Sequence, residues 1–321
     1  MHRAKYPPAW LVTIREDLVT TRLIVDTDIG TDVDDCLALA FILGSPELEL
    51  AGLTCVYGDV ALRGRMLTKL LRLSGRDDVP VVLGASEPLL GLRDVYWGGH
   101  EGVGLLDDGD ADLTPAPGHA VDFIVETVMA DPGQIHLLAI GPLTNVALTF
   151  KREPLLARAL AHLTIMGGVF RGPDAAALPY AEHNFVCDPE AAHIVLTAGA
   201  PITLVPLDVT TRVKITTAGT RRLRARGTPF HTAVADQVER YPRFAQKGAT
   251  ALHDPLAAAI ILRPDLVTLR PLHVDIETGG RLSAGLSLMR SPSANEPMTA
   301  DVALDIDVAA AETFVIDRIA S

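Results

Sequence analysis

The protein has 321 residues, of which 48% are hydrophobic, so the chain can bury a large core in one or two domains. Its formal net charge of −12 and its sequence pI near 5.2 argue against a protein that covers the phosphates of a nucleic acid. In the sequence, no apolar run approaches the roughly 18 residues that a membrane-spanning helix needs.

The N-terminal residues 1–20 do not resemble a signal peptide, because the charged run RED at residues 15–17 interrupts a short apolar stretch. The chain contains three cysteines, an odd number without the spacing of a metal site, which is typical of a reducing compartment. We therefore predict an N-terminal extension over residues 1–20 and a cytoplasmic location.

Short runs rich in valine, isoleucine and leucine then alternate with segments of helical spacing. The runs that we predict as buried strands begin at Leu23, Leu50, Val79, Ile135, Leu163 and Ile202. Several of the helical segments between them close with Gly or Pro, as helix ends often do. This alternation predicts an α/β fold with an open, mostly parallel Rossmann-like sheet and helices on both faces. Ligands of such sheets bind at the carboxyl ends of the strands.

Residues 213–248 are more charged than the segments around them, and we predict two helices there. The basic run RRLRAR at residues 221–226 is typical of a solvated helix face. We interpret residues 213–248 as a helical lid over the sheet rather than as a separate domain, so that residues 21–321 form a single domain.

The sequence DTDIGTDVDD at residues 26–35 places five aspartates directly after the first predicted strand. They are Asp26, Asp28, Asp32, Asp34 and Asp35. Like charges this close repel one another, and burying one of them unpaired is costly. A position at a helix N-terminus accounts for Asp32, and it can account for Asp34, but it does not account for all five. We therefore favour a cage of oxygen ligands for one divalent cation, with one carboxylate left to activate a water.

Two other known motifs place several aspartates in one turn. An EF-hand loop beginning at Asp26 requires Gly and Glu where the sequence has Thr31 and Leu37, so that motif is absent. The D-x-D-G-T turn of haloacid-dehalogenase-like phosphatases is interrupted by Ile29. A Mg²⁺-dependent phosphatase with an aspartate nucleophile, Asp26 or Asp28, remains an alternative.

Two further motifs carry polar side chains just before predicted helices. In AEHNFVCDPEAA, Glu182 and Asn184 are one residue apart and can present two oxygen-bearing groups to the vicinal hydroxyls of a sugar, although a surface loop would look the same. In ALHDPLAAA, His253 and Asp254 precede Pro255, which is also the pattern of a capped helix N-terminus.

Together these motifs resemble those of the nucleoside hydrolases, the calcium-dependent N-ribohydrolases called inosine-uridine preferring. The family signature D-x-D-P-G-x-D-D-A corresponds to DTDIGTDVDDCLAL, with two extra residues before the paired aspartates. The segments LTCVYGDV, AIGPLTNVAL, IMGGVF, PYAEHNFVCDPEAA and LHDPLAAA follow in the family's order. The resemblance covers nearly the whole chain after about Thr21.

The resemblance implies hydrolysis of the N-glycosidic bond of a ribonucleoside to ribose and a free base, with one tightly bound Ca²⁺. The ion would be held by the carboxylates of Asp28, Asp35 and Asp254 and by the backbone carbonyl of Ile140. It would also hold the attacking water and the ribose 2′- and 3′-hydroxyls. Asp28 would take the proton of that water, and His253 would protonate the departing base.

The remaining contacts implied by the resemblance concern the substrate. Asp34, Glu182 and Asn184 would bind ribose hydroxyls, and Met166 would pack against the sugar. Among the aromatic residues, Tyr241 is our candidate for a contact with the nucleobase. The resemblance also leads us to expect a homodimer or homotetramer.

The sequence departs from the family pattern at several positions. Asp59 stands where the family usually has an asparagine; its carboxylate would accept a hydrogen bond from a sugar hydroxyl but could not donate one. Ala176 replaces an asparagine that meets the 5′-hydroxyl, which leaves room for a modified 5′ position. The family's His-Gly pair aligns with Gly98 and Gly99, so we assign no role to His100. Because of Asp59 and Ala176, a non-catalytic nucleoside-binding protein on the same fold is a second alternative.

Overall fold

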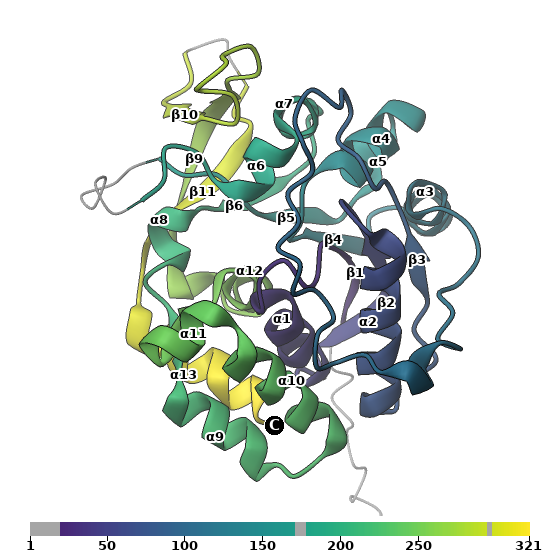
Figure 1. The fold of residues 1–321 in the computed structure, drawn as a ribbon. Coiled ribbons are helices and arrows are strands. Elements are labelled where there is room, and N and C mark those ends of the chain that lie inside the picture. The colour runs from purple at the N-terminus through teal and green to yellow at the C-terminus, as the bar shows by residue number, and fades with distance from the viewer. Residues whose placement is uncertain (1–19, 171–177, 294–296) are drawn as a thin grey trace, which may run out of the picture.

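The computed structural model describes residues 20–170, 178–293 and 297–321. Its centre is a nine-stranded sheet in the order β10-β9-β11-β6-β5-β4-β1-β2-β3 (Figure 1). The strands are β1 (Thr21–Thr27), β2 (Leu48–Cys55), β3 (Val81–Leu83), β4 (Ile135–Ala139), β5 (His162–Met166), β6 (Ile202–Val205), β9 (Val267–Ile276), β10 (Ser287–Arg290) and β11 (Ala300–Ile306). β1 to β6 and β11 pair in parallel, whereas β9 pairs antiparallel with both β10 and β11. The predicted mostly parallel sheet and its six predicted strands are therefore confirmed.

Helices cover both faces of the sheet, as predicted. They are α1 (Asp34–Leu43), α2 (Val60–Ser74), α3 (Ala120–Ala130), α4 (Thr144–Arg152), α5 (Leu156–Ala159), α6 (His183–Cys187), α7 (Pro189–Thr197), α8 (Leu207–Thr210), α12 (His253–Leu262) and α13 (Val308–Ile319), with short 3₁₀ turns η1 (Asp108–Asp110) and η2 (Pro264–Leu266). Within the described ranges, none of the helices is both long enough and apolar enough to span a lipid bilayer. Successive residues of β1 point to opposite faces, so Val25 joins one buried cluster and Ile24 the other.

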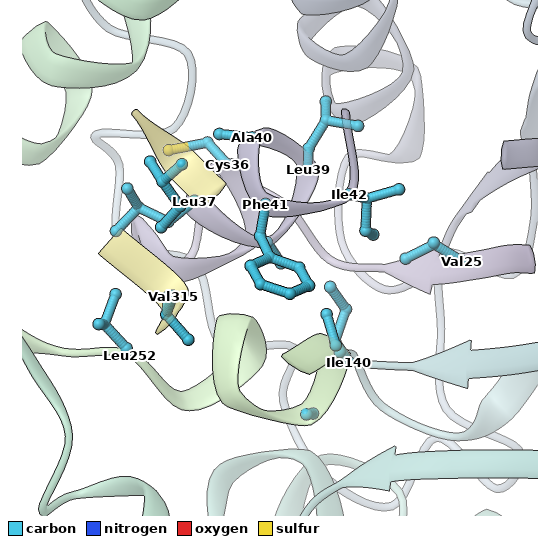
Figure 2. Packing of buried hydrophobic residues seen from close by; sticks show 14 of the residues in the cluster. Val25, Cys36, Leu37, Leu39, Ala40, Phe41, Ile42, Ile140, Leu252 and Val315 are labelled. Carbon is cyan, nitrogen blue, oxygen red and sulfur yellow. The ribbon is translucent and has the colours of Figure 1, made fainter. Parts of the chain in front are cut away.

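Helix α1 is buried along nearly its whole length and fixes the acidic turn, residues 26–35, from which it begins. Phe41 lies within the cluster, with Leu37, Leu252 and Val315 around it (Figure 2). Such a helix packs on all sides and has little freedom to shift. The aspartates of its first turn, Asp34 and Asp35, are consequently held at the carboxyl end of β1.

The segment that we predicted as a lid contains three helices rather than two. They are α9 (Thr217–Ala225), α10 (Pro229–Arg240) and α11 (Pro242–Lys247), flanked by β7 (Lys214–Thr216) and β8 (Ala249–Ala251), which pair antiparallel. Pro242 begins a new helix directly after Tyr241, which ends α10, because a residue before proline disfavours the helical conformation. Val234 and Val238 of α10 are buried in the same cluster as α1. The single-domain assignment and the lid remain predictions.

Two histidines lie side by side on the sheet, near the amino ends of their strands. His136 on β4 and His162 on β5 are partners in register, and their ring centroids are 5.2 Å apart. His136 Nε2 forms a hydrogen bond of 2.9 Å with Thr164 Oγ1. Burial, and the neighbouring His162, lower the pKa of His136 to about 3.

This lowered pKa predicts a loss of stability in mild acid. The folded state favours the neutral ring, so the stabilisation is complete above the ordinary pKa near 6.5 and is lost as the pH falls towards 3. Between pH 7 and pH 5, protonation of the unfolded chain at this one group should cost about 2 kcal/mol. His136→Gln should therefore reduce the difference in unfolding free energy between the two pH values, measured by urea denaturation. The exposed His193 supplies the control, since His193→Gln should leave that difference unchanged, and an equal result for both variants would contradict the prediction.

Candidate active site

A cavity of about 400 Å³ lies at the carboxyl ends of β1, β4 and β5. Ten of the eleven residues predicted for the site line it: Asp28, Asp34, Asp35, Ile140, Met166, Glu182, Asn184, Tyr241, His253 and Asp254. These residues come from segments up to 226 positions apart in the chain, Asp28 and Asp254 being the extremes. The fold thus gathers the predicted polar groups around one cavity.

Three buried carboxylates form the most compact part of the cavity wall. Asp34, Asp35 and Asp254 can each offer a ligand oxygen within 4.8 Å of the other two. Burial, and repulsion from the neighbouring aspartates, raise the pKa of each of them well above its usual range. A positive charge among them would remove this repulsion. A divalent cation is the natural candidate because hard cations bind carboxylate oxygens.

Asp28 adds a fourth carboxylate with an unsatisfied oxygen. Its Oδ2 is buried and, among the residues that the structure describes, has no hydrogen-bond partner. The guanidinium of Arg63 is 4.0 Å away, beyond hydrogen-bond reach. Buried oxygens without a donor are rare in folded proteins, and a ligand or an ion is one explanation. This oxygen and the carboxylates of Asp34, Asp35 and Asp254 together form a set of donors that fits a divalent cation.

Asp26 has a different environment from its neighbours in the turn. Thr54 Oγ1 and Asn145 Nδ2 donate to its Oδ1 over 2.6 Å and 2.8 Å, and burial raises its pKa to about 7. It does not line the cavity. Asp26 therefore links β1 to β2 and α4 and is not exposed as a nucleophile.

The prediction that Asp32 caps the helix is wrong. Val33 precedes α1, and no side chain caps this helix. Instead, Asp32 Oδ2 accepts a hydrogen bond of 2.8 Å from the hydroxyl of Tyr241. The bond ties the segment of residues 213–248 to the acidic turn.

Arg63 on α2 supports the acidic turn and was missed by the sequence analysis. Its side chain is 0% exposed. Nη1 donates to the backbone carbonyls of Asp28 and, over 2.6 Å, of Ile29, while Nη2 donates to Thr31 Oγ1 over 2.9 Å. The spacing of residues along the predicted helix could have indicated its burial, because Arg63 falls on the same face as the buried Leu67.

The guanidinium of Arg63 also connects this turn to two other segments. Nε donates to the carbonyl of Tyr57 over 2.6 Å, and the ring centroid of Trp97 lies 5.2 Å from the Arg63 Cζ. Tyr57 has a φ of 65°, a strained value for a residue other than glycine. A single buried cation thus holds three loops at the edge of the cavity.

Glu182 and Asn184 are buried at the cavity and do not form a surface loop. Glu182 caps α6: its Oε1 accepts from the backbone N–H of Asn184 over 2.7 Å, and its Oε2 accepts from that of Gly168 over 3.1 Å. Asn184 Nδ2 donates to the carbonyls of Ile140 and Met166 over 3.1 Å and 3.2 Å. The two side chains therefore hold the ends of β4 and β5 in place.

His253 is half-buried at the first position of α12, beside Asp254. Its Nδ1 forms a hydrogen bond of 2.7 Å with the buried hydroxyl of Thr210. Burial lowers the pKa of His253 to about 4. The helix N-terminus is confirmed, but Leu252 precedes α12 without a side-chain cap, so Asp254 is not the capping residue.

Asp59 is the predicted site residue that the structure does not bring to the cavity. Its exposed carboxylate caps α2 by accepting from the backbone N–H of Leu62 over 2.8 Å. We therefore assign Asp59 to helix capping instead of ribose binding. His100 lies in the wall of a neighbouring, smaller cavity behind Tyr241. Ala176, and with it the expected modified 5′ position, lies outside the described residues.

The comparisons with known proteins agree with this geometry. The sequence model of the inosine-uridine preferring nucleoside hydrolases matches residues 23–313. The chain belongs to the nucleoside hydrolase family. It is 36% identical over 280 residues to uridine nucleosidase 1 of Arabidopsis thaliana, covering 84% of this chain and 81% of that one. It is 34% identical over 313 residues to the pyrimidine-specific ribonucleoside hydrolase RihA of Citrobacter koseri, covering 93% and 97%.

Solved structures give the same result for this nucleoside hydrolase. The purine-preferring ribonucleoside hydrolase from Gardnerella vaginalis has a TM-score of 0.83 and 30% sequence identity, covering 94% of this chain and 98% of that one. The protein is thus an enzyme of the ribonucleoside hydrolase class. The phosphatase alternative is not supported, because the family model of the nucleoside hydrolases matches residues 23–313, Ile29 interrupts the phosphatase motif and, of its two possible nucleophiles, Asp26 is enclosed.

A cation in the acidic cluster should stabilise the folded protein. Adding Ca²⁺ to chelator-treated protein, at about one hundred times its dissociation constant, should add about 2.7 kcal/mol to the unfolding free energy. Asp254→Asn should remove most of this gain, whereas Asp265→Asn, at an exposed site paired with Arg263, should not. Thermal melting with and without Ca²⁺ measures both effects. A gain that survives in Asp254→Asn would contradict a site at the cluster.

Proposed function

We propose that the protein hydrolyses the N-glycosidic bond of ribonucleosides to ribose and a free base, with Ca²⁺ as the metal ion and Asp28 as the base. One observation carries the proposal: the unsatisfied oxygen of Asp28, the aspartate cluster and His253 meet around a single cavity. A pyrimidine base is our first choice, because the relatives at 34% and 36% identity are named for pyrimidine nucleosides and uridine.

The metal would be held by Asp28, Asp35, Asp254 and the carbonyl of Ile140, all of which line the cavity. When bound, Ca²⁺ would supply the charge that acidifies a water and orients the two vicinal ribose hydroxyls. Asp34 belongs to the same aspartate cluster and would lie next to the ion and the ribose hydroxyls. We assign Asp34, with Glu182, Asn184 and Met166, to ribose binding.

Asp28 is suited to accept the proton of the attacking water. Its backbone carbonyl is fixed by Arg63, and its Oδ2 carries no competing hydrogen bond from the described residues. Breaking the bond between C1′ and the base nitrogen leaves positive charge on the ribose. The surrounding carboxylates would stabilise this charge more in the transition state than in the bound substrate, which is the requirement for a faster reaction.

His253 would donate a hydrogen bond to the departing base. With Nδ1 bonded to Thr210, Nε2 is the ring nitrogen left for the base. The low pKa, about 4, keeps the ring neutral near pH 7. In a neutral ring whose Nδ1 accepts from the Thr210 hydroxyl, Nε2 carries the hydrogen and can donate it. Tyr241 would contact the base.

The assembly of the chain into a homodimer or homotetramer stays a prediction.

The first test is release of ribose from inosine, uridine, cytidine, adenosine and guanosine, with chelator and then with added Ca²⁺. Release that depends on Ca²⁺ is expected, with the pyrimidine nucleosides fastest. Asp28→Asn should lower the rate about 10²- to 10⁴-fold, because the amide cannot accept the proton, while far-ultraviolet circular dichroism stays unchanged. Substrate binding with no release from the wild-type protein would favour the non-catalytic alternative.

The role of His253 predicts a dependence on the leaving group. His253→Ala should slow hydrolysis of nucleosides far more than hydrolysis of p-nitrophenyl riboside, whose leaving group needs no proton. Thr210→Val should show the same pattern in weaker form, because it removes the hydroxyl that sets the ring's tautomer, and Thr210→Ser should restore activity. The measurement is kcat of each variant for nucleosides and for p-nitrophenyl riboside. Equal slowing of both by His253→Ala would contradict the leaving-group role.

A further inference from the structure

A second large cavity, of about 320 Å³, adjoins the cavity that the aspartates line. It is separate from the smaller one that His100 lines. Three residues, Thr211, Arg243 and His253, line both large cavities. The rest of its wall comes from the end of α11 and from β7 and β8, and includes Lys214 and Lys247. No acidic residue is among the lining residues within the described chain, in contrast to the first cavity with its aspartates.

Three cations without ion pairs meet at this cavity. In the described ranges, no carboxylate oxygen lies within 4.0 Å of the charged nitrogens of Lys214, Arg243 or Lys247. Some arginines of the same region are paired, such as Arg212 with Asp305 at 2.7 Å and Arg222 with Asp317 at 2.6 Å. Three unpaired cations around one cavity are a local concentration of positive charge in a chain of net charge −12.

The fold brings these three exposed cations to one cavity at the surface, where water screens part of their repulsion. Arg243 and Lys247 are four residues apart on α11, where like charges destabilise a helix. Pairing of β7 with β8 sets Lys214 opposite Ala251, next to the same helix. The carboxylate of Glu312 accepts a hydrogen bond of 2.9 Å from the backbone N–H of Lys214, not from its ammonium group. A bound anion would offset the repulsion and use all three side chains.

We propose that this second cavity is an anion subsite that receives a carboxylate carried by the base of the nucleoside. The inference rests on the proposed function, in which the base lies against His253. Since His253 and Arg243 line both cavities, the edge of the base remote from the ribose faces the three cations. Guanidinium and ammonium groups recognise carboxylates through charge-assisted hydrogen bonds. The reaction is unchanged: water adds a hydroxyl group to C1′ and a proton to the released base.

The test compares three substrates: uridine, 5-carboxyuridine and the methyl ester of 5-carboxyuridine. The ester withdraws electrons more strongly than the carboxylate and makes the base a better leaving group in every variant alike, so the change in the acid-to-ester ratio of kcat/KM between the wild type and a variant reports recognition of the charge. We expect this ratio to be lower by up to about fivefold in Lys214→Met and in Lys247→Met than in the wild-type enzyme, with a larger fall in the double variant. Hydrolysis of uridine should change less than twofold. Lys151→Met is the control, because this exposed lysine lines neither cavity.

The possible outcomes separate the inference from the proposed function. If no substrate is hydrolysed, the proposed function fails. If uridine is hydrolysed and the ratio of acid to ester is the same in the wild type and both lysine variants, the subsite is overturned. Sulfate tests whether the subsite binds a free anion. The subsite is supported if sulfate inhibits the hydrolysis of 5-carboxyuridine but not that of uridine, and if the double variant loses this inhibition. Sulfate binding that needs both lysines, without any preference for the carboxylate, would overturn the assignment to the substrate.

Discussion

The concentration of negative charge at the carboxyl end of β1 is the constraint around which this structure is organised. Asp28, Asp34, Asp35 and Asp254 are all less than 6% exposed, so water can screen little of their repulsion. Arg63 supplies a positive charge, but it bonds to carbonyls and a hydroxyl and reaches Asp28 Oδ2 only at 4.0 Å. The folded chain thus keeps its carboxylates pointed at a shared space instead of pairing them with its own cations. In such a site, repulsion among the carboxylates is relieved by a bound cation or by protonation, to which their raised pKa values correspond.

Rigid packing is what keeps these groups from moving apart. Helices α1 and α12 pack closely, and each begins at the cavity. Their contact brings the backbone N–H of Asp254 to within 3.4 Å of Asp34 Oδ2, although the two residues are 220 positions apart. Both helices are apolar over nearly all of their surface, so repulsion at their first turns would have to displace a large part of the core. The hydrophobic core therefore opposes the electrostatic repulsion in the site.

Parallel strands bring their carboxyl ends to one edge of the sheet, which is why polar residues after the predicted strands, such as Asp28, lie near one another. The family resemblance supplied the rest of the site, because His253, Asp254 and Tyr241 do not follow a predicted strand. Asp32 was assigned wrongly because a helix terminus that shifts by one residue changes which carboxylate can cap it. Asp59 was assigned to the sugar through the family resemblance, whereas its carboxylate caps α2 away from the cavity. Arg63 was missed because an arginine is ordinarily placed on the solvent face, whatever its helical spacing. Lys214 and Lys247 line the same cavity because β7 pairs with β8, which no local pattern indicates.

The two halves of the cavity are built differently, and this has a consequence for specificity. The residues assigned to the metal and the ribose lie at the ends of central strands and buried helices. The base would instead meet Tyr241 and Arg243, on a segment joined to the acidic turn through one hydrogen bond, from Tyr241 to Asp32. Exposed helices tolerate substitution, whereas the packed strand ends do not. A fold of this kind can retain the hydrolysis of the ribosyl bond while the base that it accepts changes through residues of α11 and β7 alone.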